Sequence, residues 1–413
     1  MTATRRLYYD DSFERDFKAE IVACEPAPPA SAPGRTGPAW GVLLDATAFY
    51  PASGGQPHDL GCINDGNGEA RVLDVIDEGE TILHIIDRPL CKGRVEGHLD
   101  WPRRFYHMQQ HTGQHLLSAI FQERFGLPTV SFHLGEQLCT IDLRGPEPLE
   151  DILDGAQLAA NKVVFDDRPI NVRYGTPEQL AARGIRKEVD RKGLLRAIEI
   201  EGIDLQPCGG THVRHTGQIG TILVRRCSKV RQDWRVEFVC GQRAARLARH
   251  DFTLLRTLAD KLSCPPDELA ASVERAQTER DAHFKNARAL LQQLAASEAA
   301  LTVKATAPGP NGIRVVSRVF GAEAQSEFLG AFAAELAKHE KTVALLARTE
   351  CGHVFLAQHP SAARDMAGLL KQVFEKVAGK GGGSRDSARG KLADPATAPA
   401  AVDLAAKLLS ASS

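Results

Sequence analysis

Two short motifs of histidine and cysteine, nearly a hundred residues apart, constrain this chain more than any other feature. The first holds His111 and His115, in a segment whose apolar residues recur at three- and four-residue steps and which is therefore expected to be helical from 102 to 125. Residues i and i+4 of a helix share a face, so both imidazoles point to one spot. In the second motif two glycines separate Cys208 from Thr211-His212, which lets the backbone turn tightly.

Three imidazole nitrogens and one thiolate form a tetrahedral set that suits Zn²⁺. A histidine pair alone is often a packed surface pair, and a lone cysteine is usually a small buried hydrophobe. The two motifs together, in a chain without a disulfide pattern, favour a metal site. His107 lies one turn before His111 on the same face, so His107 and His111 are an alternative ligand pair, and His133 is a further candidate.

The residues around the first motif exclude two kinds of zinc chemistry. A zinc protease carries a glutamate beside the first histidine of its His-Glu-x-x-His helix, but this chain has Thr112 there. A nucleobase deaminase uses His-x-Glu followed by Cys-x-x-Cys, and neither pattern occurs here.

Composition sets wider limits on the chain. With 413 residues, we expect two or three domains at ~150 residues each. Lys and Arg total 51 against 52 for Asp and Glu, which excludes a polycation but leaves room for a local basic face. No apolar run approaches the ~20 residues of a membrane span, and residues 1–17 are too charged for a secretory signal. The nine scattered cysteines suggest reduced thiols, so we expect a cytoplasmic protein without a membrane partner.

The pattern of elements predicts an α+β protein in four parts. Residues 1–100 are β-rich, 101–240 form an α+β metal-binding domain, 241–306 a helical connector, and 307–413 a small α/β domain. The connector has sparse leucines, so it either packs against itself or a partner copy, or is an exposed spacer. We therefore expect a homodimer through the connector or the C-terminal domain.

Individual elements follow from turn and cap signals. We expect strands at 71–76, 81–86, 138–143, 194–200, 220–225, 234–239, 313–320, 342–347 and 353–357, and helices at 102–125, 149–165, from 176, 241–303 with a break at Pro265-Pro266, 322–339, 364–377 and 401–409. The Pro-rich run 27–38 is expected to be a surface loop. The glycine-rich run 379–385 lies near the end of the C-terminal domain, before its last helix, and is assigned to no helix or strand.

Four segments resemble the editing domain of alanyl-tRNA synthetases, and more closely the free-standing alanyl-tRNA editing proteins. These are 107–118 and 207–213 around the two metal motifs, 47–59 with its Thr-x-Phe-Tyr-Pro and Gly-Gly-Gln, and 129–135. The C-terminal domain, with Gly381–Gly383, resembles the small domain that ends those synthetases. It departs from their pattern at 384–388, where serines and charged residues replace further glycines and a proline.

The resemblance implies hydrolysis of tRNA(Ala) mischarged with serine, and of Gly-tRNA(Ala), with Ala-tRNA(Ala) spared. It implies an ATP-independent deacylase that protects translation fidelity, with Zn²⁺ held by the two motifs. Thr47 then lies near the seryl side chain, and Gln114 lies in the pocket between the metal histidines. Gly54, Gly55, Gln56 and Ser131 are expected to bind substrate, although Ser53-Gly54-Gly55 is also an ordinary turn sequence.

Two other readings remain open. Four protein ligands fill a tetrahedral shell in the manner of structural zinc, so the chain is alternatively a non-catalytic tRNA- or partner-binding module. A phosphoesterase is disfavoured, because the Asp-His-His signature is absent.

Two basic clusters flank the second motif, and we expect at least one to contact phosphates of tRNA. They are Arg183, Arg186, Lys187, Arg191, Lys192 and Arg196, and Arg225, Arg226, Lys229, Arg231 and Arg235.

Overall fold

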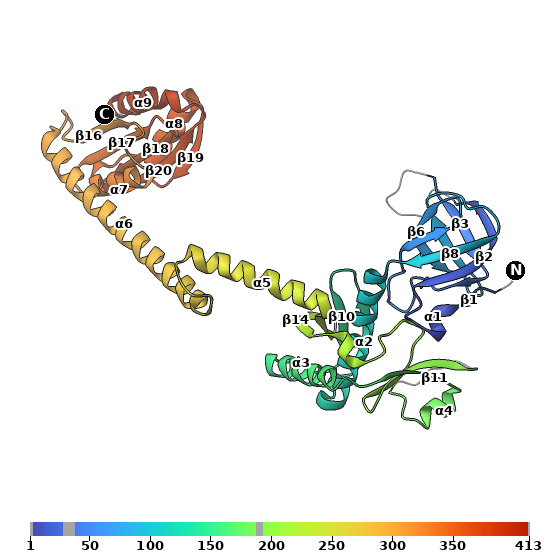
Figure 1. The fold of residues 1–413 in the computed structure, drawn as a ribbon. Helices are drawn as coiled ribbons and strands as arrows, with labels where there is room; N and C mark the ends of the chain where they lie inside the picture. The colour runs from blue at the N-terminus through green and yellow to red at the C-terminus, as the bar shows by residue number, and fades with distance from the viewer. Residues whose placement is uncertain (1–2, 28–37, 187–192, 412–413) are drawn as a thin grey trace. The chain divides into compact units, whose positions relative to one another are not determined.

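A computed structural model describes residues 3–27, 38–186 and 193–411. The chain divides into two compact units, residues 1–256 and 257–413, and each is described by itself (Figure 1). The expected mixture of helices and sheets is confirmed. No helix among the described residues is long and apolar enough to cross a membrane. Most of the expected surface loop at 27–38 lies outside the described residues.

The N-terminal unit begins with a closed antiparallel barrel in the strand order β2-β3-β7-β6-β5-β8. Its strands are β2 Asp16–Pro26, β3 Trp40–Leu44, β5 Gly61–Asn64, β6 Glu69–Asp77, β7 Ile82–Ile86 and β8 Arg94–Leu99. Before and beside it lie β1 Arg5–Arg6, paired in parallel with β4 Ala46–Thr47, and the short helix α1 Leu7–Asp10. The expected strands at 71–76 and 81–86 are confirmed as parts of β6 and β7. The closure itself was not predicted, because the sequence shows strands but not their partners.

Helix α2 Trp101–Phe125 follows the barrel directly and matches the predicted helix. Asp100 caps its first turn by accepting from the Arg103 N–H, and Gly126 ends it with a left-handed φ of 67°. Every residue from 107 to 121 is buried, so the metal motif occupies the middle of the core rather than a surface stripe.

A buried ion pair ties α2 to the barrel. Arg104, on the first turn, is fully buried, and its Nε donates to both carboxylate oxygens of Asp59 at 2.9 and 3.0 Å. Asp59 also accepts from the Tyr50 N–H at 2.7 Å, and Arg104 donates to the carbonyls of Ala48 and Ser12. The helix is thereby fixed against the loop that follows β4.

Two sheets complete this unit. One has the order β14-β15-β10-β9 and packs with helix α3 Glu150–Phe165 against α2; its strands are β9 Thr129–Leu134, β10 Cys139–Leu143, β14 Ile222–Val230 and β15 Asp233–Cys240. The other is β11 Ile170–Gly175, β12 Leu195–Ile200 and β13 Asp204–Pro207, with α4 Pro177–Ala181 before β12 and the 3₁₀ turn η2 Thr216–Ile219 after β13. The expected capping box of Thr176 and Gln179 is present.

The expected connector helices are present as α5 Gly241–Lys261 and α6 Leu269–Ala305, and Pro265 and the 3₁₀ turn η3 Pro266–Glu268 precede α6. Ala295 and Ala299 of α6 pack in the C-terminal unit against α7 Ser326–Leu336. By contrast, Leu290 and Leu294 are exposed. That a second copy of the chain covers these leucines in a homodimer stays a prediction.

The C-terminal unit is a five-stranded sheet with helices on both faces (Figure 1). The strand order is β16-β17-β18-β20-β19, with β16 Arg314–Phe320 parallel to β17 Thr342–Arg348 and the rest antiparallel. Side chains of β17 alternate: 343, 345 and 347 face α8 Met366–Lys376 and α9 Ala398–Ala411, whereas 344 and 346 face α6 and α7. β18 is His353–Gln358, and two short 3₁₀ turns, η4 Pro360–Ala362 and η5 Pro395–Thr397, precede α8 and α9.

The glycine run of this unit, which the sequence left unassigned, forms a strand. Gly379–Gly383 is edge strand β19, paired with β20 Ser387–Leu392. Glycines are poor strand formers, but here close packing demands them: a Cβ at Gly381 would lie 2.5 Å from the Arg389 carbonyl oxygen.

Candidate metal site

Helix α2 and the loop after β13 bring the two motifs together. The ligand atoms of His111, His115, Cys208 and His212 all lie within 4.8 Å of one another. The Cys208 Sγ lies 3.4 Å from the His111 Nε2 and 3.2 Å from the His212 Nε2. Two segments about a hundred residues apart therefore form a single cluster that can hold a metal ion.

Two of the imidazoles, those of His111 and His212, are oriented by a hydrogen-bond contact of the Nδ1 atom. The His111 Nδ1 lies 2.9 Å from the Gln56 Oε1, and the His212 Nδ1 lies 3.1 Å from the Thr112 Oγ1. The Thr112 hydroxyl gives its proton to the Met108 carbonyl, so it accepts from His212. Such contacts fix the tautomer and leave Nε2 free to bind a metal, as in known zinc sites.

His115 is oriented by a carboxylate. Its Nδ1 lies 3.5 Å from the Asp204 Oδ2, while Arg186 holds both oxygens of Asp204, at 2.8 and 3.2 Å. Burial lowers the pKa of His115, but Asp204 and Cys208 outweigh it and raise that pKa to about 9. Burial likewise disfavours the Asp204 carboxylate, yet His115 and Arg186 hold its pKa below the ordinary value.

The cysteine is poised as a thiolate. Burial opposes ionisation of Cys208, but the neighbouring His111 and His212 outweigh it and hold the thiol pKa well below its ordinary value. Burial lowers the pKa of His212 to about 3, so this imidazole is neutral. A thiolate beside the neutral imidazole of His212 can supply donors to a metal ion, and His115 would lose its proton when a metal binds.

The loop between Cys208 and His212 needs its second glycine for close approach. A Cβ at Gly210 would lie 2.2 Å from the His111 Cε1, whereas one at Gly209 would meet nothing closer than 3.6 Å. Arg196 holds this loop from outside by donating to the carbonyls of Cys208 and Gly210, at 2.7 and 3.0 Å. Neither glycine has a positive φ. Glycine is needed at 210 because of the close approach to His111, and not because of an unusual backbone conformation.

The cluster opens onto a cavity of about 920 Å³. Gly54 and Gly55 line it in a turn with φ of 54° and 80°, closed by mutual hydrogen bonds between Ser53 and Gln56. A Cβ at Gly55 would also lie 2.9 Å from the Phe132 ring. The glycines thus serve both the turn and the narrow space beside the cavity.

Gln114 and Ser131 also line this cavity. The Gln114 Nε2 donates to the Ser118 Oγ at 2.9 Å, but the buried Gln114 Oε1 has no hydrogen-bond partner. Ser131 donates to the Asp142 Oδ2 at 2.6 Å. Gln114 is therefore a cavity-lining residue with an unused hydrogen-bond acceptor.

Gln56 and Thr47, two of the expected site residues, do not line the cavity beside the cluster. Gln56 is behind the cluster, where its Oε1 contacts His111 and its Nε2 donates to the Thr211 hydroxyl at 2.8 Å. Thr47 is buried at the barrel, where its hydroxyl lies 2.8 Å from the His84 Nε2 and accepts from the Phe49 N–H at 3.1 Å. Neither is among the residues that line the cavity.

The other histidine candidates are not part of the cluster. His107 is buried beside a different cavity, so the pair His107 and His111 is not formed. His133 lies on β9. Asp204, Arg186 and the new role of Gln56 were missed, because nothing in their local sequence marks them as partners of the metal motifs.

Four residues of the two basic clusters form ion pairs or hydrogen bonds within the protein. Arg186 and Arg196 serve the site as described, Arg225 pairs with Asp251, and Arg235 pairs with Asp142. Lys187, Arg191 and Lys192 lie outside the described residues. Contact of either cluster with phosphates stays a prediction.

Comparison with known proteins first defines the class. Residues 1–102 match the family model described as tRNA synthetases class II (A), and residues 195–235 match the threonyl and alanyl tRNA synthetase second additional domain. The second segment contains Cys208 and His212. The fold and cluster therefore belong to the editing part of an alanyl-tRNA synthetase-like protein.

Full-length relatives narrow the assignment. The chain is 31% identical over 400 residues to the alanyl-tRNA editing protein AlaX-L of Pyrococcus horikoshii, covering 94% of each chain, and 31% identical over 391 residues to the alanyl-tRNA editing protein Aarsd1 of Rattus norvegicus, covering 92% of each. It is also 28% identical to the alanine–tRNA ligase of Pyrococcus abyssi, over 98% of this chain and 44% of the ligase. The chain belongs to the family of alanyl-tRNA editing proteins, as its sequence motifs predicted.

Proposed function

We propose that this protein deacylates Ser-tRNA(Ala), and also Gly-tRNA(Ala), in trans, and spares Ala-tRNA(Ala). Two editing proteins that match along nearly their whole length support this activity. The observation that carries it is the cluster of His111, His115, Cys208 and His212 at the edge of the 920 Å³ cavity. The reaction adds water to the ester carbonyl carbon, breaks the bond to the ribose oxygen, and leaves that oxygen with a proton.

The resident cofactor of this proposal is Zn²⁺, and the four residues of the cluster would hold it. The donor set fits, since Gln56, Thr112 and Asp204 each engage one imidazole. When bound, the ion supplies positive charge that orients the substrate and stabilises the developing oxyanion. Because the substrate is an activated ester, positioning within the cavity supplies much of the remaining catalysis.

Selection of serine over alanine is assigned to Gln114. A seryl hydroxyl in the cavity can donate to its unpartnered Oε1, while its Nε2 stays on Ser118. An alanyl group would leave that buried acceptor unsatisfied, which costs about 1–3 kcal/mol. Thr47 is the second candidate. It does not line the cavity and its hydroxyl contacts His84, so its effect on selection would be indirect.

The remaining roles are proposals of the same kind. Gly54, Gly55 and Ser131 are assigned to substrate binding from their place on the cavity wall, and Gln56 to the orientation of His111. We propose the four-part division at 100, 240 and 306, with the connector and C-terminal domain mediating dimerisation or recognition of tRNA(Ala). Nine free cysteines support a reducing, cytoplasmic location.

A second function, a non-catalytic binding module with structural zinc, is favoured by one observation. The cluster offers four protein ligands, which complete a tetrahedral shell and leave no open position. This reading predicts bound zinc and tRNA binding without turnover.

Deacylation assays with Ser-, Gly- and Ala-charged tRNA(Ala), with metal analysis of the same preparations, separate the two functions. We expect Ser-tRNA(Ala) to be hydrolysed, turnover to be lost with chelator and restored by Zn²⁺, and His111→Ala or Cys208→Ala to lose both metal and activity. Bound zinc without hydrolysis would establish the binding module, and full turnover in either variant would refute the ligand assignment. If a chain ending at residue 240 keeps the oligomeric state and the tRNA selectivity of the full chain, the proposed role of the connector and C-terminal domain is refuted.

A further inference from the structure

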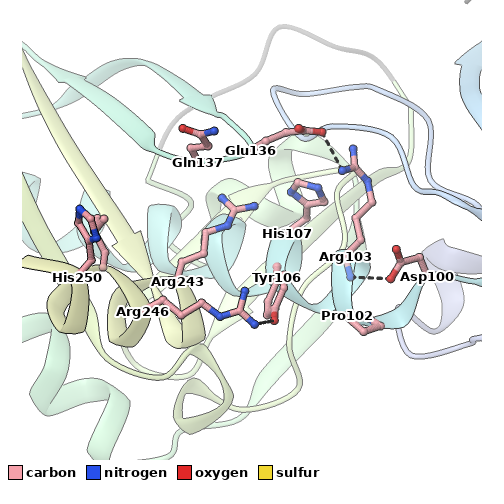
Figure 2. A pocket seen from close by; sticks show the side chains of 11 residues that line it. Asp100, Pro102, Arg103, Tyr106, His107, Glu136, Gln137, Arg243, Arg246 and His250 are labelled. Carbon is pink, nitrogen blue, oxygen red and sulfur yellow. Dashed lines mark hydrogen bonds and ion pairs between the residues drawn. The ribbon is translucent and has the colours of Figure 1, made fainter. Parts of the chain in front are cut away.

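A second cavity of about 610 Å³ lies at the N-terminal end of α2 and is lined by none of the four cluster residues. Figure 2 shows the side chains that line it. It is formed by the first turns of α2, the hairpin between β9 and β10, and the start of α5. Its volume is typical of small-molecule sites. Apolar surface comes from Pro102, Tyr106 and Leu247, so the cavity can receive an organic group as well as a charged one.

At its inner wall, His107 is almost completely buried, at 1% exposure, and neither ring nitrogen has a hydrogen-bond partner. Burial, followed by the charges of Arg103 and Arg243, lowers the pKa of His107 to about 3. The ring is therefore neutral and offers one N–H donor. A buried imidazole with two unsatisfied nitrogens is unusual in a folded protein, and it leaves hydrogen-bonding capacity unused at the wall of the cavity.

Two guanidinium groups near this imidazole have no carboxylate partner among the described residues. Arg243 donates to the Gly135 carbonyl at 2.9 Å, and Arg246 donates to the Tyr106 hydroxyl at 2.9 Å. Burial lowers the pKa of Arg243, which reflects the cost of a partly buried cation without an anion. Figure 2 shows Arg243 extending into the same space as His107.

The acidic residues of the cavity are already used. Glu136 pairs with Arg103 at 2.8 Å, and Asp100 accepts from the first turn of α2. The site therefore presents two uncompensated positive charges and a neutral imidazole. A phosphate monoester carries a charge of about −1.5 to −2 and three terminal oxygens, which matches this set. A carboxylate or a backbone phosphodiester brings only one negative charge.

We propose that this cavity binds a terminal phosphate group, with Arg243, Arg246 and His107 contacting its oxygens. The depth of His107 excludes a phosphodiester, since both of its ester links would have to enter the cavity. The group comes either from a free mononucleotide or from the 5′ end of an RNA. This site is independent of the deacylase activity proposed above.

Calorimetric titration of the full chain with inorganic phosphate, AMP and acetate tests the site. We expect saturable binding of phosphate and AMP and none of acetate. Arg246→Ala, at an exposed position of α5, should weaken AMP binding about tenfold or more. The matched control is Arg249→Ala, three residues further along α5 and outside the cavity, which should bind as wild type. His107→Leu should weaken binding with a native melting curve; if it fails to fold, the Arg246 pair still decides.

Short RNAs with a 5′-phosphate or a 5′-hydroxyl distinguish the two sources. Tighter binding of the phosphorylated RNA, lost in Arg246→Ala, identifies an RNA end as the ligand. Equal binding of both RNAs, together with saturable AMP binding, identifies a free phosphate compound. Absence of saturable phosphate and AMP binding, or equal losses in Arg246→Ala and Arg249→Ala, overturns the proposal. None of these readouts depends on hydrolysis of aminoacyl-tRNA.

Discussion

Replacing Gly210 by alanine tests whether the two metal motifs must fit each other closely. The added Cβ would lie 2.2 Å from the His111 Cε1 and 2.5 Å from its Nδ1. To reach an ordinary contact of 3.4 Å, the ring or the loop must move by about 1.2 Å. Metal–ligand distances tolerate only about ±0.2 Å, and the same movement disturbs the hydrogen bond from His111 to Gln56. We therefore expect zinc affinity to fall by about 10- to 100-fold or more, the range seen when ligand orientation is lost.

Gly209→Ala is the matched control, because its Cβ meets only the Tyr9 ring at ordinary contact distance. Zinc content and affinity should be measured by elemental analysis and competition with a chromophoric chelator, alongside hydrolysis of Ser-tRNA(Ala). Gly209→Ala should retain zinc and most activity, while Gly210→Ala loses both. Wild-type affinity in Gly210→Ala would show that the described approach of loop and helix is not required for metal binding.

Three further perturbations test other parts of the molecule. Gln114→Met should lower the preference for Ser- over Ala-tRNA(Ala) about tenfold or more with zinc content unchanged; an unchanged ratio would move selection to Thr47 or the backbone. Asp59→Asn leaves the Arg104 charge buried without its partner and should lower the free energy of unfolding in urea by about 3–5 kcal/mol. A loss below about 1 kcal/mol would contradict a stabilising role of this ion pair. Burial lowers the pKa of His84 from 6.5 to about 4, so the unfolded chain binds its proton more tightly. His84 therefore contributes to the free energy of unfolding above pH 6.5, and this contribution, up to about 3 kcal/mol, should be lost as the pH falls towards 4. In urea unfolding at several pH values, His84→Gln should lack this part of the pH dependence.

The sequence was most informative where a pattern is local. The helix from 102 to 125, its stop at Gly126 and the capping box at Thr176 all depend on neighbouring residues, and all are confirmed. The strand at Gly379–Gly383 was missed because its stability comes from pairing with β20 and not from its own residues.

The candidate site also contains features that local sequence patterns predict and features that depend on how distant segments pack. The convergence of His111, His115, Cys208 and His212 was predictable, because their residue types and spacings suggest a shared metal site. The orientation of His115 by Asp204 depends on how strands β12 and β13 pair, which no local pattern shows. Thr47 illustrates the limit of resemblance, since a motif can mark a residue without giving the direction of its side chain.

The ion pair between Arg104 and Asp59 affects how this protein can be cut into parts. The two matched family segments, 1–102 and 195–235, suggest separable modules with a border near residue 102. A fragment beginning there would carry all four residues of the cluster, but it would leave Arg104 without its counter-ion Asp59 and His111 without its contact to Gln56. The smallest fragment worth expressing therefore includes the barrel.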